Sequence, residues 1–339
     1  DTSRINTLLR LGASLREINR DSSLLFFGAA LGGSIKTRYI YGIITALSGL
    51  GSIYRDQGDF EQAKDYYFRA IRLCRQMHAE QLLPGIYNAF GRLYASQGKY
   101  REATELYYKG IHIADQLSPV VNADYIYNNL AIALTQSGRS YKEVLQYLEK
   151  AEKAALREQN HSLLGTVLIN KGIAYNIIKA WDSSRYYFHR ALELGRKHNI
   201  PHVIHMACSN IGITFLEEER PDAAMPYLLQ ADSMNPQVNP FRQNITFYTL
   251  GDAYFKQGKY TQAEQLLLEG LNRAKSMDHK LVLREIYLIL GKLYGTTKQY
   301  TKAYTYLRLY ININNNIAGE EITQNVNQLE VKYRTAQKD

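Results

Sequence analysis

The sequence has few of the residues that build disulfide frameworks and metal centres, and no segment suited to a membrane. Its two cysteines in 339 residues, Cys74 and Cys208, lie far apart in the chain. We expect both to be buried free thiols, without a disulfide or a metal site. No run of about twenty apolar residues occurs, so the sequence predicts no membrane span.

A concentration of charge of one sign is also missing. The formal net charge is +9, from 41 Lys and Arg against 32 Asp and Glu, and the two signs are interleaved along the chain. Nucleic-acid-binding domains usually carry a basic patch or stripe on one face. We therefore interpret the charges as solvated outer helix faces and expect no direct binding of nucleic acid by this chain.

Motifs for catalysis and cofactor binding are lacking as well. Gly49 and Gly51 have neither the third glycine nor the preceding strand of a dinucleotide-binding loop. The best metal candidate is the set His198, His202 and His205, but no carboxylate accompanies it, and exposed imidazoles in a turn between hairpins account for it equally well. The sequence predicts no catalytic residue, cofactor or metal, and a metal-dependent enzyme that uses these histidines is the least favoured alternative.

What the sequence does contain is an internal repeat of about forty residues. The stretches GLGSIYRDQGDFEQAKDYYFRAI and FGRLYASQGKYREATELYY share one order of small and aromatic residues. A small residue, referred to below as the repeat centre, recurs with an aromatic residue or leucine three residues later. Repetition of this length indicates a solenoid, in which each unit packs against its neighbours. The repeat centres are Gly12, Gly51, Gly91, Ala131, Gly172, Gly212, Gly251 and Gly291.

Each repeat has the pattern of two amphipathic helices. In the second repeat, Leu47, Leu50 and Tyr54 recur at spacings of three and four residues, which is the stripe of an amphipathic helix. Gly58 is expected to end this helix, and Asp59 to cap the next one.

Small residues are expected where the two helices of a hairpin meet. In the second repeat these residues are Gly51 and Ala63, and we predict that they let the two backbones approach closely. Large aromatic residues such as Tyr67 would fill the space beside this contact. Most of the 28 tyrosines are therefore interpreted as packing residues.

The repeated pattern Leu-Gly-x-x-Tyr, Gly-Lys-Tyr-x-x-Ala, then an aromatic residue and an alanine, resembles the tetratricopeptide repeat (TPR) family, whose unit is a helical hairpin. The distance from Gly51 to Gly91 is 40 residues instead of roughly 34, as in a longer-repeat branch of the family. This resemblance covers residues 1–316. It implies an all-α, right-handed superhelical solenoid of about eight hairpins, which we expect to form one elongated domain.

Residues 317–339 break the repeat. Ile322, Val326, Leu329 and Tyr333 recur at spacings of four, three and four residues and predict one more amphipathic helix. This helix would cap the last hairpin or lead to another domain. The phrase NQLEVKYRTAQKD resembles the junction of bacterial membrane-tethered TPR signalling proteins. That resemblance implies a periplasmic location, with a cytoplasmic one as the alternative, and a membrane tether elsewhere in the full-length protein.

The resemblance to TPR proteins also implies a binding surface. In a TPR array the first helix of each hairpin lines a concave groove, and the residue two before the repeat centre faces that groove. Three consecutive repeats carry Asn129, Asn170 and Asn210 there. An asparagine amide offers a donor and an acceptor, so this ladder could pair with successive peptide groups of an extended chain, as in kinesin light chains. The alternative is that the asparagines cap neighbouring helices or meet water.

Further residues flank the asparagines at the repeat spacing, and we expect them to contact the side chains of a bound segment. Those six before the repeat centre are Tyr125, Thr166 and Met206, and those one after it are Ile132, Ile173 and Ile213. The residues six before, two before and one after each repeat centre are referred to below as the inner-face positions. Without a ligand the groove would be filled with water. We therefore expect alanine substitution of the ladder asparagines to leave the stability of the protein almost unchanged.

An acidic C-terminus is not the expected ligand. The carboxylate clamp of chaperone-binding TPR proteins needs Lys and Arg beside Asn on adjacent first helices, and this pattern is absent around the asparagine ladder. Arg92 and Lys292 are expected to face the groove elsewhere, but they look isolated in the sequence.

The sequence as a whole predicts non-enzymatic binding of a peptide or protein segment in the concave groove. The resemblance implies the input domain of a bacterial signalling or transcription-regulatory protein. The alternative is an assembly scaffold that binds a folded partner on its convex face.

Overall fold

The structure, a computed structural model, describes residues 2–16, 19–117, 124–234, 240–277 and 280–315. The chain forms two compact units: an N-terminal unit over residues 1–178 and a C-terminal unit over residues 179–339. Each is described by itself. The C-terminal segment 317–339, with its predicted helix, lies outside the described residues.

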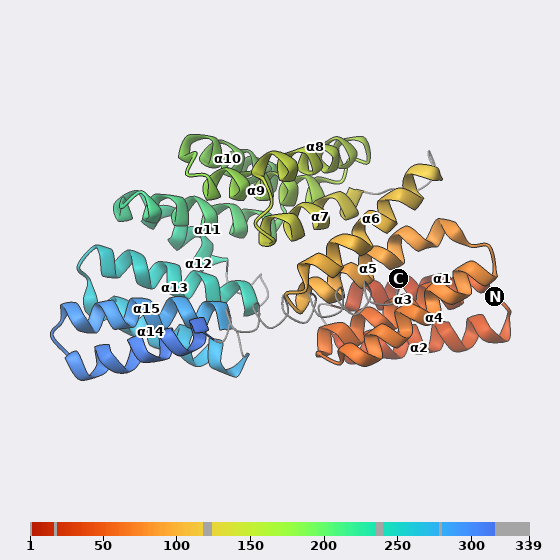
Figure 1. Cartoon of the computed structure of the whole chain (residues 1–339), viewed down its shortest axis with the longest axis horizontal. Helices are drawn as coiled ribbons and strands as arrows, with labels where there is room; N and C mark the ends of the chain where they lie inside the picture. The colour runs from red at the N-terminus through yellow and green to blue at the C-terminus, as the bar shows by residue number, and fades with distance from the viewer. Residues whose placement is uncertain (1, 17–18, 118–123, 235–239, 278–279, 316–339) are drawn as a thin grey trace, which may run out of the picture. The chain divides into compact units, whose positions relative to one another are not determined.

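The N-terminal unit is built from consecutive helices, shown from red to green in Figure 1. Within the described residues they are α1 (Thr2–Leu15), α2 (Arg20–Lys36), α3 (Ile40–Gln57), α4 (Phe60–Gln76), the 3-10 helix η1 (Glu80–Leu82), α5 (Leu83–Ser96), α6 (Tyr100–Gln116), α7 (Asp124–Gln136), α8 (Tyr141–Arg157) and α9 (His161–Ile177).

The C-terminal unit continues the same alternation. Its helices are α10 (Trp181–Lys197), α11 (Pro201–Glu217), α12 (Pro221–Ser233), α13 (Pro240–Lys256), α14 (Tyr260–Ser276), α15 (Lys280–Thr296) and a last helix over residues 300–315. No strand occurs in the described parts of the chain. The predicted all-α fold is confirmed, and every repeat centre lies in an odd-numbered helix, referred to below as a first helix.

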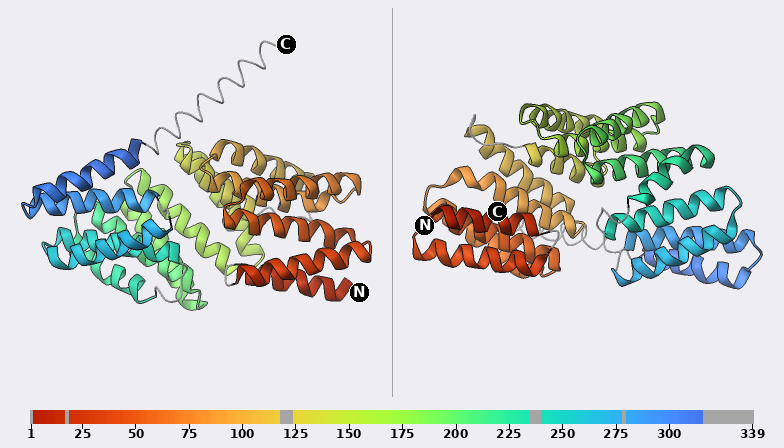
Figure 2. Two further views of the ribbon diagram at one scale, coloured as in Figure 1. Left: turned by 90° about the horizontal axis from the view of Figure 1, so that it is seen from below. Right: turned by 180° about the vertical axis from the view of Figure 1, so that it is seen from behind.

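The first helices form a layer of their own within each unit. In the N-terminal unit α1 contacts α3, α3 contacts α5, α5 contacts α7 and α7 contacts α9; in the C-terminal unit α11 contacts α13 and α13 contacts α15. The even-numbered second helices contact first helices, and none of those described makes a comparable contact with another second helix. Because the first helices lie closer together, their layer is the inner one of each row of hairpins, which Figure 2 shows stacked side by side.

The repeat centres receive a large side chain from the second helix of the same hairpin. A Cβ atom on Gly91 would lie 2.4 Å from the ring of Tyr107, and one on Gly51 would lie 2.9 Å from the ring of Tyr67. Both tyrosines are fully buried. The sequence predicted that two backbones approach closely at Gly51. In the structure it is the ring of Tyr67 that lies against the backbone of Gly51. The same arrangement joins Gly212 to Leu228, Gly251 to Leu267 and Gly291 to Leu307.

The turn inside the second hairpin follows the sequence prediction. Gly58 ends α3 in the left-handed conformation with φ +82°, which glycine adopts without strain. The Asp59 side chain then accepts a hydrogen bond of 3.1 Å from the backbone N–H of Gln62 and caps α4.

The cysteines and histidines singled out in the sequence belong to the helix packing. Cys74 and Cys208 are buried free thiols, as predicted, and burial raises the pKa of each to about 11. His205 is a buried residue of α11 with Nε2 3.0 Å from Thr246 Oγ1, so the interpretation of an exposed imidazole in a turn is wrong for it. In the part of the chain that the structure describes, no three His, Cys, Asp or Glu side chains could together hold a metal ion.

None of the described helices combines the length and the apolar character that crossing a membrane requires.

Candidate functional site

The inner-face positions share one side of each first helix, because they are separated by four and three residues. On α7 the side chains of Tyr125 and Ile132 are 54% and 38% exposed. The remaining inner-face residues of α7 and α9 are half-buried: Asn129, Thr166, Asn170 and Ile173. The predicted binding residues of the N-terminal unit therefore lie on two adjacent first helices and reach the surface.

The same face is hollowed at the first two repeats. A pocket of about 560 Å³ lies there, and the α1 residues at the three inner-face positions, Asn6, Arg10 and Ala13, line it together with Thr45 at an inner-face position of α3. Leu9, Tyr39 and Tyr41 complete the lining. The sequence analysis did not single out these residues, although the repeat places them at the positions of Tyr125, Asn129 and Ile132.

The ladder asparagines of the N-terminal unit hydrogen-bond to the next first helix. Asn129 Nδ2 donates to Asn88 Oδ1 at 2.8 Å, which joins α7 to α5. Asn170 Nδ2 donates to Asn128 Oδ1 at 2.8 Å, which joins α9 to α7. Both acceptors lie three residues before their repeat centres, and Asn128 is only 4% exposed. The sequence left open that the asparagines cap neighbouring helices or contact water. The structure shows a third arrangement, in which they hydrogen-bond to a side chain of the next first helix.

The hydrogen bonds between helices leave part of each ladder amide available. Asn129 and Asn170 each retain a second N–H and the Oδ1 oxygen, which form no hydrogen bond within the described residues. A donor and an acceptor thus remain on each side chain. Since the bond to the neighbouring helix holds the amide in place, less conformational freedom would be lost on binding a peptide group.

In the C-terminal unit the equivalent asparagine is bonded differently. Asn210 Nδ2 donates to the carbonyl oxygen of Met206 in its own helix, α11, at 2.8 Å. Met206, Asn210 and Ile213 are half-buried at the inner-face positions of α11. The three predicted ladder residues therefore share a repeat position but not one hydrogen-bonding arrangement.

A cluster of arginines, which the sequence analysis missed, lies after the repeat centres, towards the C-terminal ends of the first helices in the first three repeats. Arg16 follows α1, Arg55 and Asp56 are in the last turn of α3, and Arg92 is in α5. Arg16 Nε lies 3.3 Å from Asp56 Oδ2, and Arg55 Nη2 lies 2.6 Å from Asp56 Oδ1. Desolvation and the charges of Arg55 and Arg16 lower the pKa of Arg92, so its interpretation as an isolated residue is wrong.

The sequence signal for this cluster was the spacing of its members from the repeat centres. Arg16 and Arg55 each lie four residues after a centre, in consecutive repeats, and Arg92 lies one residue after the third centre. Residues one and four after the centre are one helical turn apart. The cluster is therefore a repeat-spaced feature, like the asparagine ladder.

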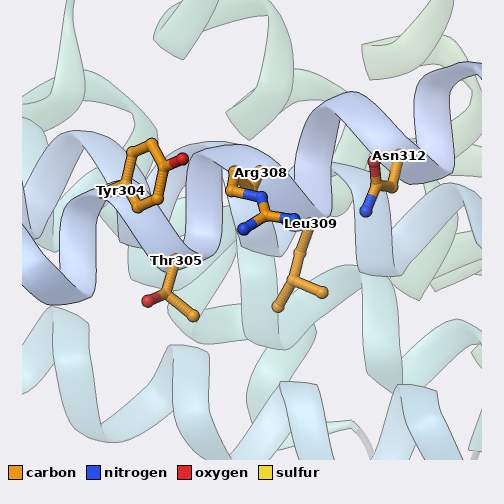
Figure 3. Close-up of a pocket in the computed structure, with 5 residues that line it drawn as sticks. All are labelled: Tyr304, Thr305, Arg308, Leu309 and Asn312. Atoms are coloured by element: carbon orange, nitrogen blue, oxygen red, sulfur yellow. The ribbon is translucent and has the colours of Figure 1, made fainter.

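A second hollow, of about 160 Å³, lies on the last described helix. Figure 3 shows its lining residues, Tyr304, Thr305, Arg308, Leu309 and Asn312, all of which belong to the helix over residues 300–315. The Arg308 guanidinium lies 5.8 Å from the centre of the Tyr304 ring. This hollow is small and has a single helix as its wall, so it is a weaker candidate than the inner face.

Comparison with known families identifies the repeat. Family models described as tetratricopeptide repeat match residues 42–116, 207–238, 246–277 and 285–317, which together are about half of the chain. The chain belongs to the tetratricopeptide repeat family. The matches fall in both units of this TPR chain. No curated protein matches its sequence.

Several solved structures have a similar fold. The apo form of RapI has a TM-score of 0.65 at 13% identity over 81% of this chain and 99% of its own. NprR in complex with its cognate peptide NprX has a TM-score of 0.63 at 14% identity over 90% and 88%. A tetratricopeptide repeat protein from Parabacteroides merdae has a TM-score of 0.55 at 18% identity over 80% and 93%. At these identities the likeness shows that the TPR chain has the same helical solenoid fold.

Proposed function

We propose that this TPR chain is a non-enzymatic domain that binds an extended peptide or protein segment on the inner face of its first helices. The observation that carries the proposal is the pair Asn129 and Asn170, which lie at one repeat position on adjacent helices and each keep a donor and an acceptor. The similar structures support it, since NprR was solved with its cognate peptide NprX and a Rap protein with the competence and sporulation factor.

The spacing of the helices suits an extended ligand. Packed helices lie about 8–10 Å apart, and an extended chain advances about 3.3 Å per residue. A peptide that crosses the first helices would therefore present roughly every third peptide group to successive asparagines. These contacts would not depend on the ligand's side chains, because they involve its backbone.

Selectivity would come from the other inner-face positions. Tyr125 and Ile132 on α7, with Thr166 and Ile173 on α9, would contact the ligand's side chains. Met206, Asn210 and Ile213 are the corresponding residues of the C-terminal unit. In this proposal the asparagines fix the course of the peptide and the flanking residues discriminate between sequences.

We further propose that peptide binding is the input of a signalling or transcription-regulatory protein. The similar structures include the quorum sensor NprR from B. thuringiensis. They also include a signal-transduction ATPase with a tetratricopeptide repeat sensor from Pyrococcus horikoshii, of which this chain covers 49%. A regulatory module encoded next to this chain in the full-length gene would support this role.

The binding face can be tested with an array of synthetic peptides followed by calorimetry on the peptides that bind. Ile132→Asp places a charge on the inner face, and we expect it to lower affinity at least about tenfold, or about 1.4 kcal/mol. Leu156→Asp, at a 55% exposed apolar residue of the second helix α8, is the matched control and should bind normally. Loss of binding in the control alone would favour the convex scaffold instead.

A further inference from the structure

We propose that the solvent-facing side of α2 is a self-association surface, against which the α2 helix of a second copy of this chain packs antiparallel. This inference goes beyond the proposed peptide binding and does not depend on it, because α2 is a second helix and the inner face is formed by first helices. The exposed residues of this side are referred to below as the α2 face. They are Asp21, Leu25, Gly28, Ala29, Gly32, Ile35 and Lys36.

The α2 face is poor in charge for an exposed surface. The chain carries no charged residue from Ser22 to Ile35. Leu25 and Ile35 are 74% and 58% exposed. A surface helix normally places charged residues opposite its buried stripe, and exposed apolar patches mark interaction sites. The next second helix, α4, follows that rule with the exposed residues Glu61, Asp65, Arg69 and Arg72.

Two glycines of the α2 face are not explained by packing within the chain. Where a Cβ on Gly28 or Gly32 would lie, no atom comes within 4 Å other than those of the chain neighbours and the helix's own backbone. Glycine in the middle of a helix is less favourable than alanine, so both positions cost stability without a gain in packing. At the repeat centres, by contrast, a glycine receives a large side chain. Gly28 and Gly32 would receive one from a second molecule.

The α2 face is complementary to itself about a two-fold axis. In an antiparallel pair centred between Gly28 and Ala29, Leu25 of each copy lies opposite Gly32 of the other, and Gly28 lies opposite Ala29. Large side chains thus meet small residues, as they do at the repeat centres. Glycines four residues apart also let two helix backbones approach closely.

Charge favours the antiparallel orientation. Asp21 lies in the first turn of α2 and Lys36 in the last, and neither forms an ion pair within the described residues. In the antiparallel pair each Asp21 lies opposite a Lys36, whereas a parallel pair would bring like charges together. Both charges also suit the helix dipole, and a charge swap separates the two effects.

The dimer should form reversibly. A single pair of helices buries less surface than the roughly 1,200–2,000 Å² of a stable protein interface. We therefore expect a dissociation constant in the micromolar range. Because the contact uses second helices, each copy would keep the inner face of its first helices accessible.

Sedimentation velocity of the purified chain, from low micromolar to millimolar concentration, tests the dimer. We expect the sedimentation coefficient to rise from that of a monomer to that of a dimer. Gly28→Gln with Gly32→Gln should weaken the dimer at least tenfold and raise the melting temperature of the monomer, since glutamine favours a helix more than glycine does. Gly85→Gln is the matched control, because Gly85 is also exposed, in a helix, with open space around its Cβ position. This variant should dimerise normally.

The charge swap tests the orientation. Asp21→Lys alone places like charges at both ends of the antiparallel pair and should weaken the dimer about tenfold. Asp21→Lys combined with Lys36→Asp restores opposite charges across the pair while opposing the helix dipole, and we expect it to restore the dimer. If the double variant is as weak as the single one, the antiparallel pair is wrong.

Three further results would overturn the proposal. A chain that remains monomeric at millimolar concentration does not self-associate. A dimer that forms equally well with glutamine at Gly28 and Gly32 uses another surface. If the monomer binds phosphatidylcholine vesicles and the two glutamines abolish this binding, the α2 face contacts lipid instead of a second copy.

Discussion

Two glycines of the same helix illustrate how differently single residues are constrained in this repeat. Gly91, a repeat centre in α5, faces the buried ring of Tyr107. At Gly85, in the first turn of α5, the place where a Cβ would lie has no atom within 4 Å other than those of its chain neighbours and its own helix backbone. The sequence predicted a small residue at Gly91 from the repeat. The partner that makes it necessary is sixteen residues away on another helix, and only the structure identifies that partner as a ring.

Alanine at these two positions should change stability in opposite directions. Gly91→Ala would place Cβ 2.4 Å from the Tyr107 ring, and we expect it to lower the free energy of unfolding by about 1–3 kcal/mol. Gly85→Ala has open space and gains helix propensity, so it should raise the free energy of unfolding, by at most about 1 kcal/mol. Urea denaturation of both variants checks this. Equal effects would mean that the ring does not constrain Gly91.

The two thiols should be unreactive in the folded protein. Burial raises the pKa of Cys74 and of Cys208 to about 11, so near neutral pH almost all of each thiol is protonated and poorly nucleophilic. We expect reaction with a chromogenic disulfide reagent at pH 7.5 to be on the order of 100-fold slower than in guanidinium chloride. Two thiols should react once the chain is unfolded. Fast reaction of one thiol without denaturant would show that its helix opens readily.

At the scale of the helices, the asparagines connect neighbouring repeats. Their positions could be predicted because the repeat period places them. Their partners could not, because Asn88 and Asn128 occupy a different repeat position, and periodicity along one helix does not determine how the next helix is rotated. The arginine cluster escaped prediction for the same reason: Arg92 has its neighbours on other helices.

Loss of one of these amides should affect stability, contrary to the expectation from the sequence. Asn170→Ala removes the donor to Asn128 Oδ1, whose residue is 4% exposed, and should lower the free energy of unfolding by about 1–3 kcal/mol. Asn210→Ala removes only a bond to a carbonyl of its own helix and should cost less. Chemical denaturation provides the comparison. If both variants lose equally little stability, the bond between α7 and α9 contributes nothing measurable.

At the scale of the whole molecule, the repeat made the fold predictable. Eight repeat centres in the sequence became eight first helices, because each hairpin needs only its neighbours to bury its apolar face. The expected single elongated domain remains a prediction. The helix predicted for residues 317–339 also remains a prediction, and the exposed face of the last described helix offers a way to test it.

Removal of the C-terminal segment should expose this face. Tyr304 and Ile311 of the helix over residues 300–315 are 64% and 53% exposed. If the predicted amphipathic helix covers them, truncation before Glu320 should lower the melting temperature and the solubility. Tyr304→Lys with Ile311→Lys in the truncated chain should restore solubility. A truncated chain that melts and dissolves like the full chain would show that the segment leads elsewhere.

The pattern of helix contacts has a further consequence for how the chain is made. Every extensive contact among the α-helices from α1 to α15 joins helices whose numbers differ by at most two. Such local topologies fold quickly, because little loop-closure entropy is lost before native contacts form. On the ribosome, the first hairpins could pack as soon as the third helix emerges, long before the C-terminus is synthesised. The arginine cluster, which needs only α1, α3 and α5, would then be complete when less than a third of the chain has emerged from the ribosome.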